Sequence, residues 1–453
     1  MRRARGSLRV STVCVAAPSR YAVMFATAAT VMLMACSSSG PNSVPRASDA
    51  CCLETGRMVA AQYRVSTITT RRFTHRDLWA ALDPVVKAPV FRTTTFGASM
   101  HGRPLRAITF GTGPTTVLLW SQMHGDESTA TMSLADILTW FAEPKRDRND
   151  VRDLLASRLT IVMVPMLNPD GAELFQRENA MGVDVNRDAR RLSTPEARAL
   201  KALRDSIMPA FGFNLHDQNA RTLGSSTGRQ VGIALLAPAA DAEKSYGPTR
   251  ATARLVAATI RRVLEQEIPN RVARYDDAFN PRAFGDLIQQ WGTSTVLIES
   301  GALPNDPEKQ QLRRVNVIAL LTALEAIATG GYRAADPALY DALPVNDRAA
   351  VDVLVLGADV VIPGQAPMRV DLAYNYDDAL RKGRARIRDI GDLAAVVALD
   401  TIQASGQFVH PAPAMLTTQD GKSWLRVNAP VQFTIRRGPD AASALVREIG
   451  GTP

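Results

Sequence analysis

Cysteine is almost absent from this 453-residue chain, which has four, none of them beyond Cys52. The segment from Leu53 to Pro453 therefore contains no disulfide and no cysteine nucleophile. Cys51 and Cys52 are adjacent in sequence and would pair with each other only under strain. Thiol catalysis and disulfide stabilisation are thus excluded for most of the chain.

The excess of positive over negative charge is small outside the N-terminal segment. The net charge is +9, but five arginines precede Cys36 and no acidic residue precedes Asp49. Removal of residues 1–35 would lower the net charge to +4, and no basic run with interleaved aromatic residues follows. The composition therefore gives no indication of nucleic-acid binding. A hydrophobic fraction of 46% and a charged fraction of 21% are typical of a globular protein.

The apolar segment near the N-terminus, residues 21–35, is too short for a comfortable membrane span. It follows a basic region that ends at Arg20, and this pattern predicts a secretory signal peptide over residues 1–35. The segment ends in Leu-Met-Ala-Cys36, which resembles the bacterial lipobox. That resemblance implies cleavage before Cys36 and a lipid on its sulfur, with the protein anchored in the cell envelope on the outer-membrane or periplasmic side. The alternative is an ordinary signal peptide with a chance cysteine.

Hydrophobic patterning divides the rest of the chain into three segments. Residues 36–65 begin rich in serine and proline and are interpreted as a flexible tether. Strand and helix patterns alternate over 66–332, which predicts an α/β fold with a mixed, mostly buried sheet flanked by helices. Residues 333–453 predict a small β-rich domain. The strands expected in the α/β segment are 105–110, 116–120, 159–164, 231–236 and 294–298, and the helices are 74–82, 128–141, 249–266, 307–327 and one that opens at Thr194-Pro195.

The strongest local signal is the turn that follows the apolar run Thr116–Trp120. His124 and Glu127 lie between that predicted strand and a helical pattern that starts at Ser128, which could cap the helix. Open α/β sheets bind ligands at such strand-to-helix turns. An imidazole and a carboxylate three residues apart can reach one small cation and suit zinc. A histidine and a glutamate at this spacing also occur by chance, so the motif alone is weak.

Further blocks follow in a fixed order along the chain: Asn168–Gly171, Arg177–Asn179, Gly182–Arg187, Phe213–Asp217 and Thr295–Gly301. This series, together with the histidine and glutamate above, resembles the M14 family of zinc carboxypeptidases over roughly Phe73 to Thr329. The resemblance implies the fold of that family and a zinc-dependent hydrolase that acts on peptide bonds.

A hydrolytic zinc needs three protein ligands and one open position for water. His124 and Glu127 supply two, and His216 matches the third ligand of the family, so one Zn²⁺ per chain is expected. The other histidines, His75, His101 and His410, lie outside the matched blocks.

The resemblance also implies residues that orient the ligands and carry the reaction. Asp184 matches the aspartate that orients the first histidine, and Asp217 is a second residue that could support a ligand. Glu299 ends an apolar strand, where a carboxylate is costly without a partner, and matches the general base. Arg177 matches the arginine that stabilises the oxyanion, and Asn186-Arg187 matches the pair that binds a terminal carboxylate.

Two departures leave the substrate open. Asp126 stands where the family often has an arginine, and Asp277 stands where the digestive members have a tyrosine, with Tyr275 the nearest one.

The sequence predicts an exported, lipid-anchored metallocarboxypeptidase acting on peptides or peptidoglycan-derived peptides. Alternatives are an amidase of cell-wall peptides or a deacylase of N-acyl amino acids on the same scaffold, and an inactive cell-surface binding module.

Overall fold

The computed structural model describes residues 49–143 and 148–450. The expected signal peptide and Cys36 lie outside these residues. Helix α1 (Asp49–Gln62) occupies most of the latter part of the expected tether and packs against α9 (Gln310–Thr329). A side chain at Gly56 would come within 2.8 Å of the Ile318 Cα, so the two helices approach closely. The tether interpretation of residues 36–65 is therefore wrong for 49–62.

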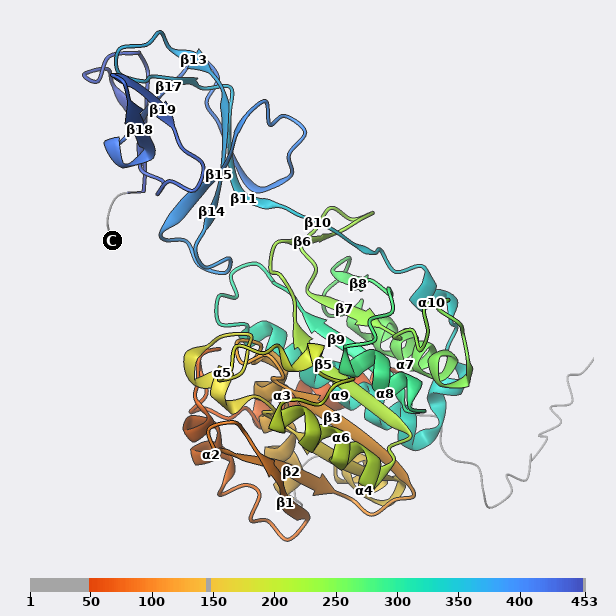
Figure 1. The fold of residues 1–453 in the computed structure, drawn as a ribbon. Helices are drawn as coiled ribbons and strands as arrows, with labels where there is room; N and C mark the ends of the chain where they lie inside the picture. The colour runs from red at the N-terminus through yellow and green to blue at the C-terminus, as the bar shows by residue number, and fades with distance from the viewer. Residues whose placement is uncertain (1–48, 144–147, 451–453) are drawn as a thin grey trace, which may run out of the picture. The chain divides into compact units, whose positions relative to one another are not determined.

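A mixed sheet of eight strands forms the centre of the α/β segment (Figure 1). In spatial order its strands are β1 (Phe91–Ala98), β2 (Pro104–Phe110), β4 (Leu159–Val164), β3 (Thr115–Ser121), β5 (Phe211–Asp217), β9 (Ser294–Ser300), β7 (Ile233–Leu236) and β8 (Val272–Arg274). Strands β4, β3, β5 and β9 are parallel, so their carboxyl ends meet at one edge of the sheet. The expected fold class is confirmed.

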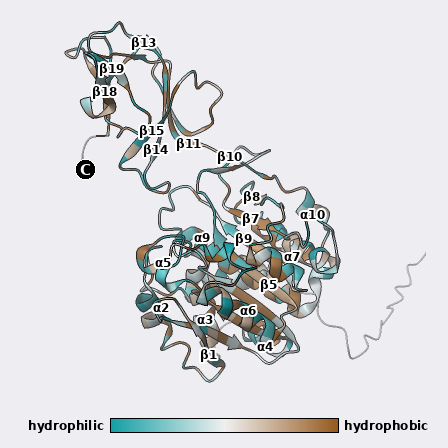
Figure 2. Ribbon diagram, in the orientation of Figure 1, coloured by the Kyte–Doolittle hydropathy of each residue, from teal (hydrophilic) through white to brown (hydrophobic). Residues whose placement is uncertain are grey.

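Helices cover both faces of this sheet, and the strands bury side chains toward each. Val117 and Leu119 of β3 belong to one hydrophobic core, whereas Leu118 and Trp120 belong to the other. Figure 2 shows hydrophobic residues concentrated along the central strands. The first core includes residues of α1, α9, α2 (His75–Leu82), α3 (Thr129–Ala142), α4 (Asn149–Arg158) and α7 (Pro248–Leu264), and the second includes residues of α6 (Pro195–Ile207) and α8 (Phe284–Gln290).

Short helices and strands complete this segment and lead out of it. They are α5 (Pro169–Leu174), the 3₁₀ helices η1 (Val185–Arg187) and η2 (Gly331–Ala334), α10 (Ala338–Asp341), and β10 (Asn346–Ala349) paired with β6 (Thr222–Gly224). No helix among the described residues has both the length and the apolar character needed to cross a membrane.

The C-terminal region is rich in β-strands, as expected. One sheet contains β15 (Ala385–Gly391), β14 (Asp371–Tyr376), β11 (Val351–Leu356) and β16 (Ala398–Gln403). Another contains β13 (Met368–Arg369), β12 (Asp359–Val360), β17 (Phe408–Pro411), β20 (Phe433–Arg436) and β21 (Leu445–Ile449), and a hairpin joins β18 (Leu416–Gln419) to β19 (Lys422–Leu425), with η3 (Pro413–Met415) before it. The two larger sheets share one hydrophobic core. The expected domain boundary at residues 332–333 stays a prediction.

Candidate metal centre and active site

The turn that carries His124 and Glu127 has a tightly constrained backbone. Gln122 adopts a left-handed conformation, with φ of 52°, directly after β3. Its side-chain amide donates to the Gly125 carbonyl at 2.9 Å and so holds the turn. A Cβ atom on Gly125 would lie 2.0 Å from the carbonyl carbon of Gly171, so this position requires glycine. Strained backbone of this kind is often found at functional sites.

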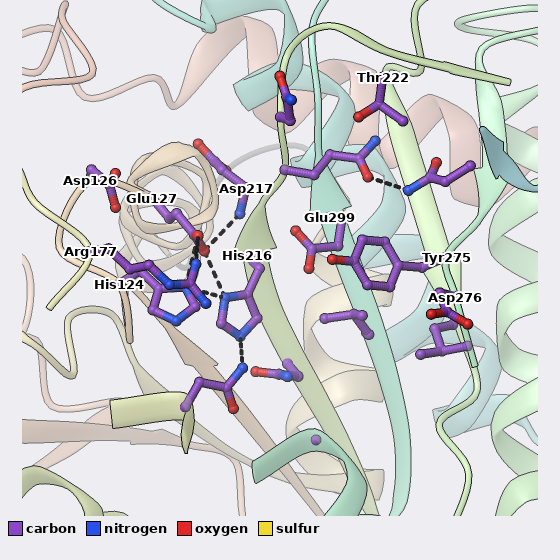
Figure 3. Close-up of a pocket in the computed structure, with 18 of the residues that line it drawn as sticks. His124, Asp126, Glu127, Arg177, His216, Asp217, Thr222, Tyr275, Asp276 and Glu299 are labelled. Atoms are coloured by element: carbon purple, nitrogen blue, oxygen red, sulfur yellow. Dashed lines mark hydrogen bonds and ion pairs between the residues drawn. The ribbon is translucent and has the colours of Figure 1, made fainter. Parts of the chain in front are cut away.

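The turn brings together the three predicted ligands at the carboxyl edge of the sheet (Figure 3). Glu127 Oε1 lies 2.7 Å from His124 Nδ1, and Glu127 Oε2 lies 2.7 Å from His216 Nδ1. The two Nδ1 atoms are 3.2 Å apart. One donor atom from each of the three buried side chains lies within 4.8 Å of the others. Because β3 and β5 are adjacent and parallel, His216 at the end of β5 lies next to the turn that follows β3.

This arrangement fits a metal ion such as zinc. Two imidazole nitrogens and a carboxylate converge on one point, and these are the ligand types that zinc prefers. Ligating histidines usually engage their second nitrogen with another group. His124 Nε2 lies 3.0 Å from Asp184 Oδ1, as expected, and His216 Nε2 lies 3.4 Å from Asn186 Nδ2. The residues present therefore suit a zinc centre of three protein ligands.

The electrostatics of the cluster also favour a cation. Burial opposes the charged form of His124, but the carboxylates of Glu127 and Asp184 outweigh it and raise the pKa of this ring to about 9. Burial likewise opposes ionisation of Glu127, but the two histidines lower its pKa. Asp184 has a lowered pKa because His124 and Arg177 outweigh its burial. Both carboxylates are thus held in the ionised form, which attracts positive charge to the cluster.

Arg177 lies beside the ligands and faces the pocket. Its Nε donates to Asp184 Oδ2 at 3.0 Å, and its Nη1 lies 3.3 Å from Glu127 Oε1 and 3.2 Å from His124 Nδ1. Its side chain keeps 38% of its surface exposed. A partly free guanidinium next to the ligand set can donate hydrogen bonds to an anion that forms there.

Glu299 faces the same pocket from the end of β9. The register of β5 and β9 pairs it with His216. Its Oε2 is buried and has no hydrogen-bond partner among the described residues. Burial, reinforced by the charge of Glu127, raises the pKa of Glu299 well above its usual value. Figure 3 shows the Tyr275 hydroxyl directed toward Glu299, and that carboxylate, with burial, raises the Tyr275 pKa to about 12.

Asn186 and Arg187, the pair predicted to bind a substrate carboxylate, differ in how far their side chains are already engaged by other residues. The Asn186 side chain accepts a hydrogen bond from the Phe284 backbone N–H at 2.9 Å and donates toward His216, so it already supports the site. Arg187 lines the pocket, and its Nη1 donates to the Asn186 carbonyl at 2.8 Å. Arg187 is therefore the freer of the two residues for ligand binding.

Asp217 contacts the cluster through its backbone and not through its side chain. Its carboxylate accepts hydrogen bonds from Thr129 Oγ1 at 2.7 Å and from Lys309 Nζ at 3.0 Å, and only its backbone N–H touches the cluster, at Glu127 Oε2. No sequence motif indicates a role for Lys309. Adjacent residues of a strand point to opposite faces, so the Asp217 side chain points away from the His216 ring.

These side chains line one cavity of about 1070 Å³. Besides the residues above, its wall includes Asn214, Leu236, Pro238, Leu297 and Asp286, together with residues 346–347 and 377–380 of the β-rich region. Asn214 lies within the block Phe213–Asp217 but had no predicted role, and Asp286 belongs to no motif with recognisable spacing. Tyr275 was noted without a role, yet it lies in this cavity.

Comparison with known proteins gives a match in the same region. Residues 85–216 match the family model described as zinc carboxypeptidase (Peptidase_M14). Carboxypeptidase SOL1 of Arabidopsis thaliana is 26% identical over 129 residues, which are 27% of this chain and 26% of that protein. The catalytic chain of human carboxypeptidase N is 29% identical over 151 residues, 29% of this chain and 33% of that protein. The chain thus matches about a quarter to a third of the length of these relatives.

Among solved structures, a metallo-carboxypeptidase from Burkholderia cenocepacia is 20% identical with a TM-score of 0.45, covering 56% of this chain and 70% of that one. Carboxypeptidase A from Helicoverpa armigera is 15% identical with a TM-score of 0.46, covering 61% and 80%. The matched segment 85–216 contains His124, Glu127 and His216. The family match and the curated relatives therefore show that the segment with these three residues is similar to zinc carboxypeptidases.

Proposed function

We propose that this protein is an exported zinc metallocarboxypeptidase, which releases the C-terminal residue of a peptide. The observation that carries the proposal is the convergence of His124, Glu127 and His216 in one cavity that Glu299 also lines. Hydrolytic zinc sites use such a three-ligand set and keep a further position for water. The match of residues 85–216 to zinc carboxypeptidases independently supports the same reaction class.

A zinc ion held by these three side chains would activate a water molecule and polarise the carbonyl group of the scissile bond. In this proposal Glu299 carries out the proton transfers. One of its carboxylate oxygens accepts a proton from the attacking water and then donates it to the nitrogen of the leaving amine. The buried Oε2 without a partner supports this role, because a carboxylate oxygen that faces the cavity in this way can accept a proton.

Arg177 and Arg187 have separate roles in the proposal. Negative charge develops on the carbonyl oxygen during attack, and Arg177 donates to it from its position beside Glu127. Arg187 binds the terminal carboxylate of the substrate, because its planar guanidinium can form two parallel hydrogen bonds with it. Asn186 contributes less, since Phe284 and His216 already engage its amide.

The proposal includes export and a lipid anchor. The signal-like segment 1–35 and the lipobox-like sequence before Cys36 support it, and both lie outside the described residues. A lipidated cysteine would hold the enzyme at the cell envelope. Its substrates would then be peptides of that compartment, including peptides derived from peptidoglycan.

The test of the proposal is a panel of three substrate classes offered to the zinc-loaded protein: peptides with free C-termini, muropeptides and N-acyl amino acids. Mass spectrometry of the products should show the loss of single C-terminal residues from peptides. Turnover confined to muropeptide amides or to N-acyl amino acids would replace the proposal with the corresponding rival reaction. Bound zinc without any turnover would favour an inactive binding module.

A further inference from the structure

The β-rich region supplies part of the wall of the catalytic cavity. The loop between β14 and β15, residues 377–384, contributes its first four residues, 377–380, to the lining. The metal ligands and Glu299 line the same cavity. The described residues of both regions belong to one compact unit. A loop that lies far from the ligands in the sequence is therefore within reach of a bound substrate.

The start of this loop is fixed to the segment that follows β5. The Arg221 guanidinium donates to both carboxylate oxygens of Asp352 on β11, at 2.9 and 2.7 Å, and to the Tyr376 carbonyl at 2.8 Å, directly before the loop. Asp352 is buried, and its Oδ2 also accepts the Tyr376 backbone N–H at 2.7 Å. A bidentate pair of this kind fixes the orientation of its two partners. The loop therefore begins beside Thr222, which lines the cavity.

Two ion pairs fix the loop further along. Asp378 pairs with Arg71, and Arg381 pairs with Glu308. Glu308 also accepts the Arg71 backbone N–H at 2.9 Å, so the two pairs are joined. The Arg71 side chain is only 12% exposed, and salt screens a partly buried pair less than a pair at the surface. The loop is thus held in place at both ends of its cavity-lining part.

The residues that hold the loop also contact the segments that carry the metal ligands. The Arg71 carbonyl accepts the Ser128 hydroxyl at 2.6 Å, and Ser128 directly follows Glu127. Lys309, the residue after Glu308, donates to the Asp217 carboxylate at 3.0 Å. The loop is therefore attached next to the turn after β3 and next to the end of β5.

This wall lies on the other side of the ligand cluster from Arg187. Asn186, the neighbour of Arg187, contacts the His216 ring, whereas Lys309 contacts the Asp217 carboxylate. His216 and Asp217 are consecutive on β5, so their side chains point to opposite faces. A peptide whose terminal carboxylate binds Arg187 and whose last peptide bond lies at the ligands extends its amino end away from Arg187. Its amino end therefore runs toward the loop.

We propose that the loop 377–384 closes the site on the amino side of the substrate and restricts the enzyme to peptides of a few residues. The inference rests on the proposed carboxypeptidase function. The cavity of about 1070 Å³ is close to the size of pockets that enclose a compact ligand, roughly 300–1,000 Å³. A short peptide ends within such a cavity, whereas a long or folded chain collides with residues 377–380.

The test compares a tripeptide with a long peptide that carries the same three residues at its C-terminus. We expect kcat/KM of the wild type to be at least about tenfold higher for the tripeptide. Tyr376 pairs with Ala385 across β14 and β15, so a two-residue Asn-Gly turn can replace residues 377–384 while the hairpin is kept. This shortened variant should cleave both peptides with nearly equal kcat/KM.

A double variant tests the same point with the loop at full length. Asp378→Asn with Arg381→Gln removes both ion pairs and should lower the ratio of the two kcat/KM values at least about twofold. The matched control, Asp359→Asn with Arg369→Gln, removes an ion pair elsewhere in the β-rich region and should leave the ratio unchanged. Equal cleavage of both peptides by the wild type would overturn the proposal. A ratio that keeps its wild-type value in both loop variants would overturn it as well.

A binding measurement separates failure of the restriction from failure of the reaction. Calorimetry of the zinc-loaded Glu299→Gln variant with the two peptides reports recognition without turnover. Tighter binding of the tripeptide, lost when the loop is also shortened, supports the restriction even if the wild type cleaves neither peptide, an outcome that would contradict the proposed function alone. Equal binding of both peptides, or binding of neither, contradicts the restriction.

Discussion

At the scale of single residues, the ligand cluster acts as a unit, because each carboxylate oxygen of Glu127 faces one imidazole. We predict that His216→Ala lowers zinc from about one ion per chain to nearly none after dialysis, since two ligands hold zinc poorly. Elemental analysis measures this, with circular dichroism to confirm folding. His101→Ala changes an exposed histidine outside the cluster and should keep the metal. Full zinc content in His216→Ala would rule this residue out as a ligand.

We predict that Glu299 is required for turnover but not for zinc binding. Glu299→Gln preserves the shape of the side chain but cannot accept the proton of the attacking water. We expect kcat to fall roughly 10²–10⁴-fold, as is typical for loss of a general base, with zinc content and melting temperature close to wild type. Steady-state kinetics beside metal analysis gives both quantities. Near-normal kcat in this variant would place the base on another residue.

The three clustered residues His124, Glu127 and His216 could be selected from the sequence, because they follow apolar strands and lie in the family-like blocks. The sequence could not determine which partners surround them. The His216 ring meets Asn186, whereas Asp217 beside it turns to Lys309, which follows it by 92 positions in the chain. Contacts of this kind depend on how segments distant in the sequence pack together. The spacing of residues within a short motif does not predict them. Asp286 escaped notice for the same reason.

At the scale of elements, the turn after β3 fixes the geometry of the site. We predict that Gly125→Ala destabilises the fold by at least about 1–3 kcal/mol and weakens zinc binding, because the new Cβ would clash with the Gly171 backbone. Thermal unfolding and zinc titration measure the two effects. Gly247→Ala is the control, since a Cβ there meets nothing within 4 Å. Equal stability of the two variants would mean that the turn relaxes without cost.

Long elements with clear periodicity were predictable, and elements set by tertiary contacts were not. The predicted helix over 307–327 corresponds to α9, and the predicted strand over 294–298 corresponds to β9. Helix α1 was missed because its sequence lacks a strong apolar stripe and its stability comes from packing on α9. Ser128 takes the N-cap position of α3 without a capping bond, since its hydroxyl donates to the Arg71 carbonyl.

At the scale of the whole molecule, the proposed lipid anchor would decide where the protein is located. We predict that wild-type protein expressed in a bacterial host pellets with membranes and that Cys36→Ser moves it to the soluble fraction. A diacylated cysteine holds a protein firmly, whereas an unmodified chain lacks that attachment. Immunoblots of fractionated cells measure the distribution, with Cys51→Ser as the matched control that should stay in the membrane. Wild-type protein in the soluble fraction after export would refute the anchor.

The central claim joins the zinc cluster to the release of a C-terminal residue. Its most direct measurement is kcat/KM for one peptide with a free C-terminus and for the same peptide amidated, each with wild type and Arg187→Ala. Amidation removes the charge that Arg187 binds, and charged hydrogen bonds contribute about 1.5–3 kcal/mol, so we predict at least a roughly tenfold loss in the wild type. Arg187→Ala should erase most of that difference. Equal cleavage of both peptides by wild-type enzyme, or cleavage at internal bonds, would contradict the carboxypeptidase account while leaving the zinc site intact.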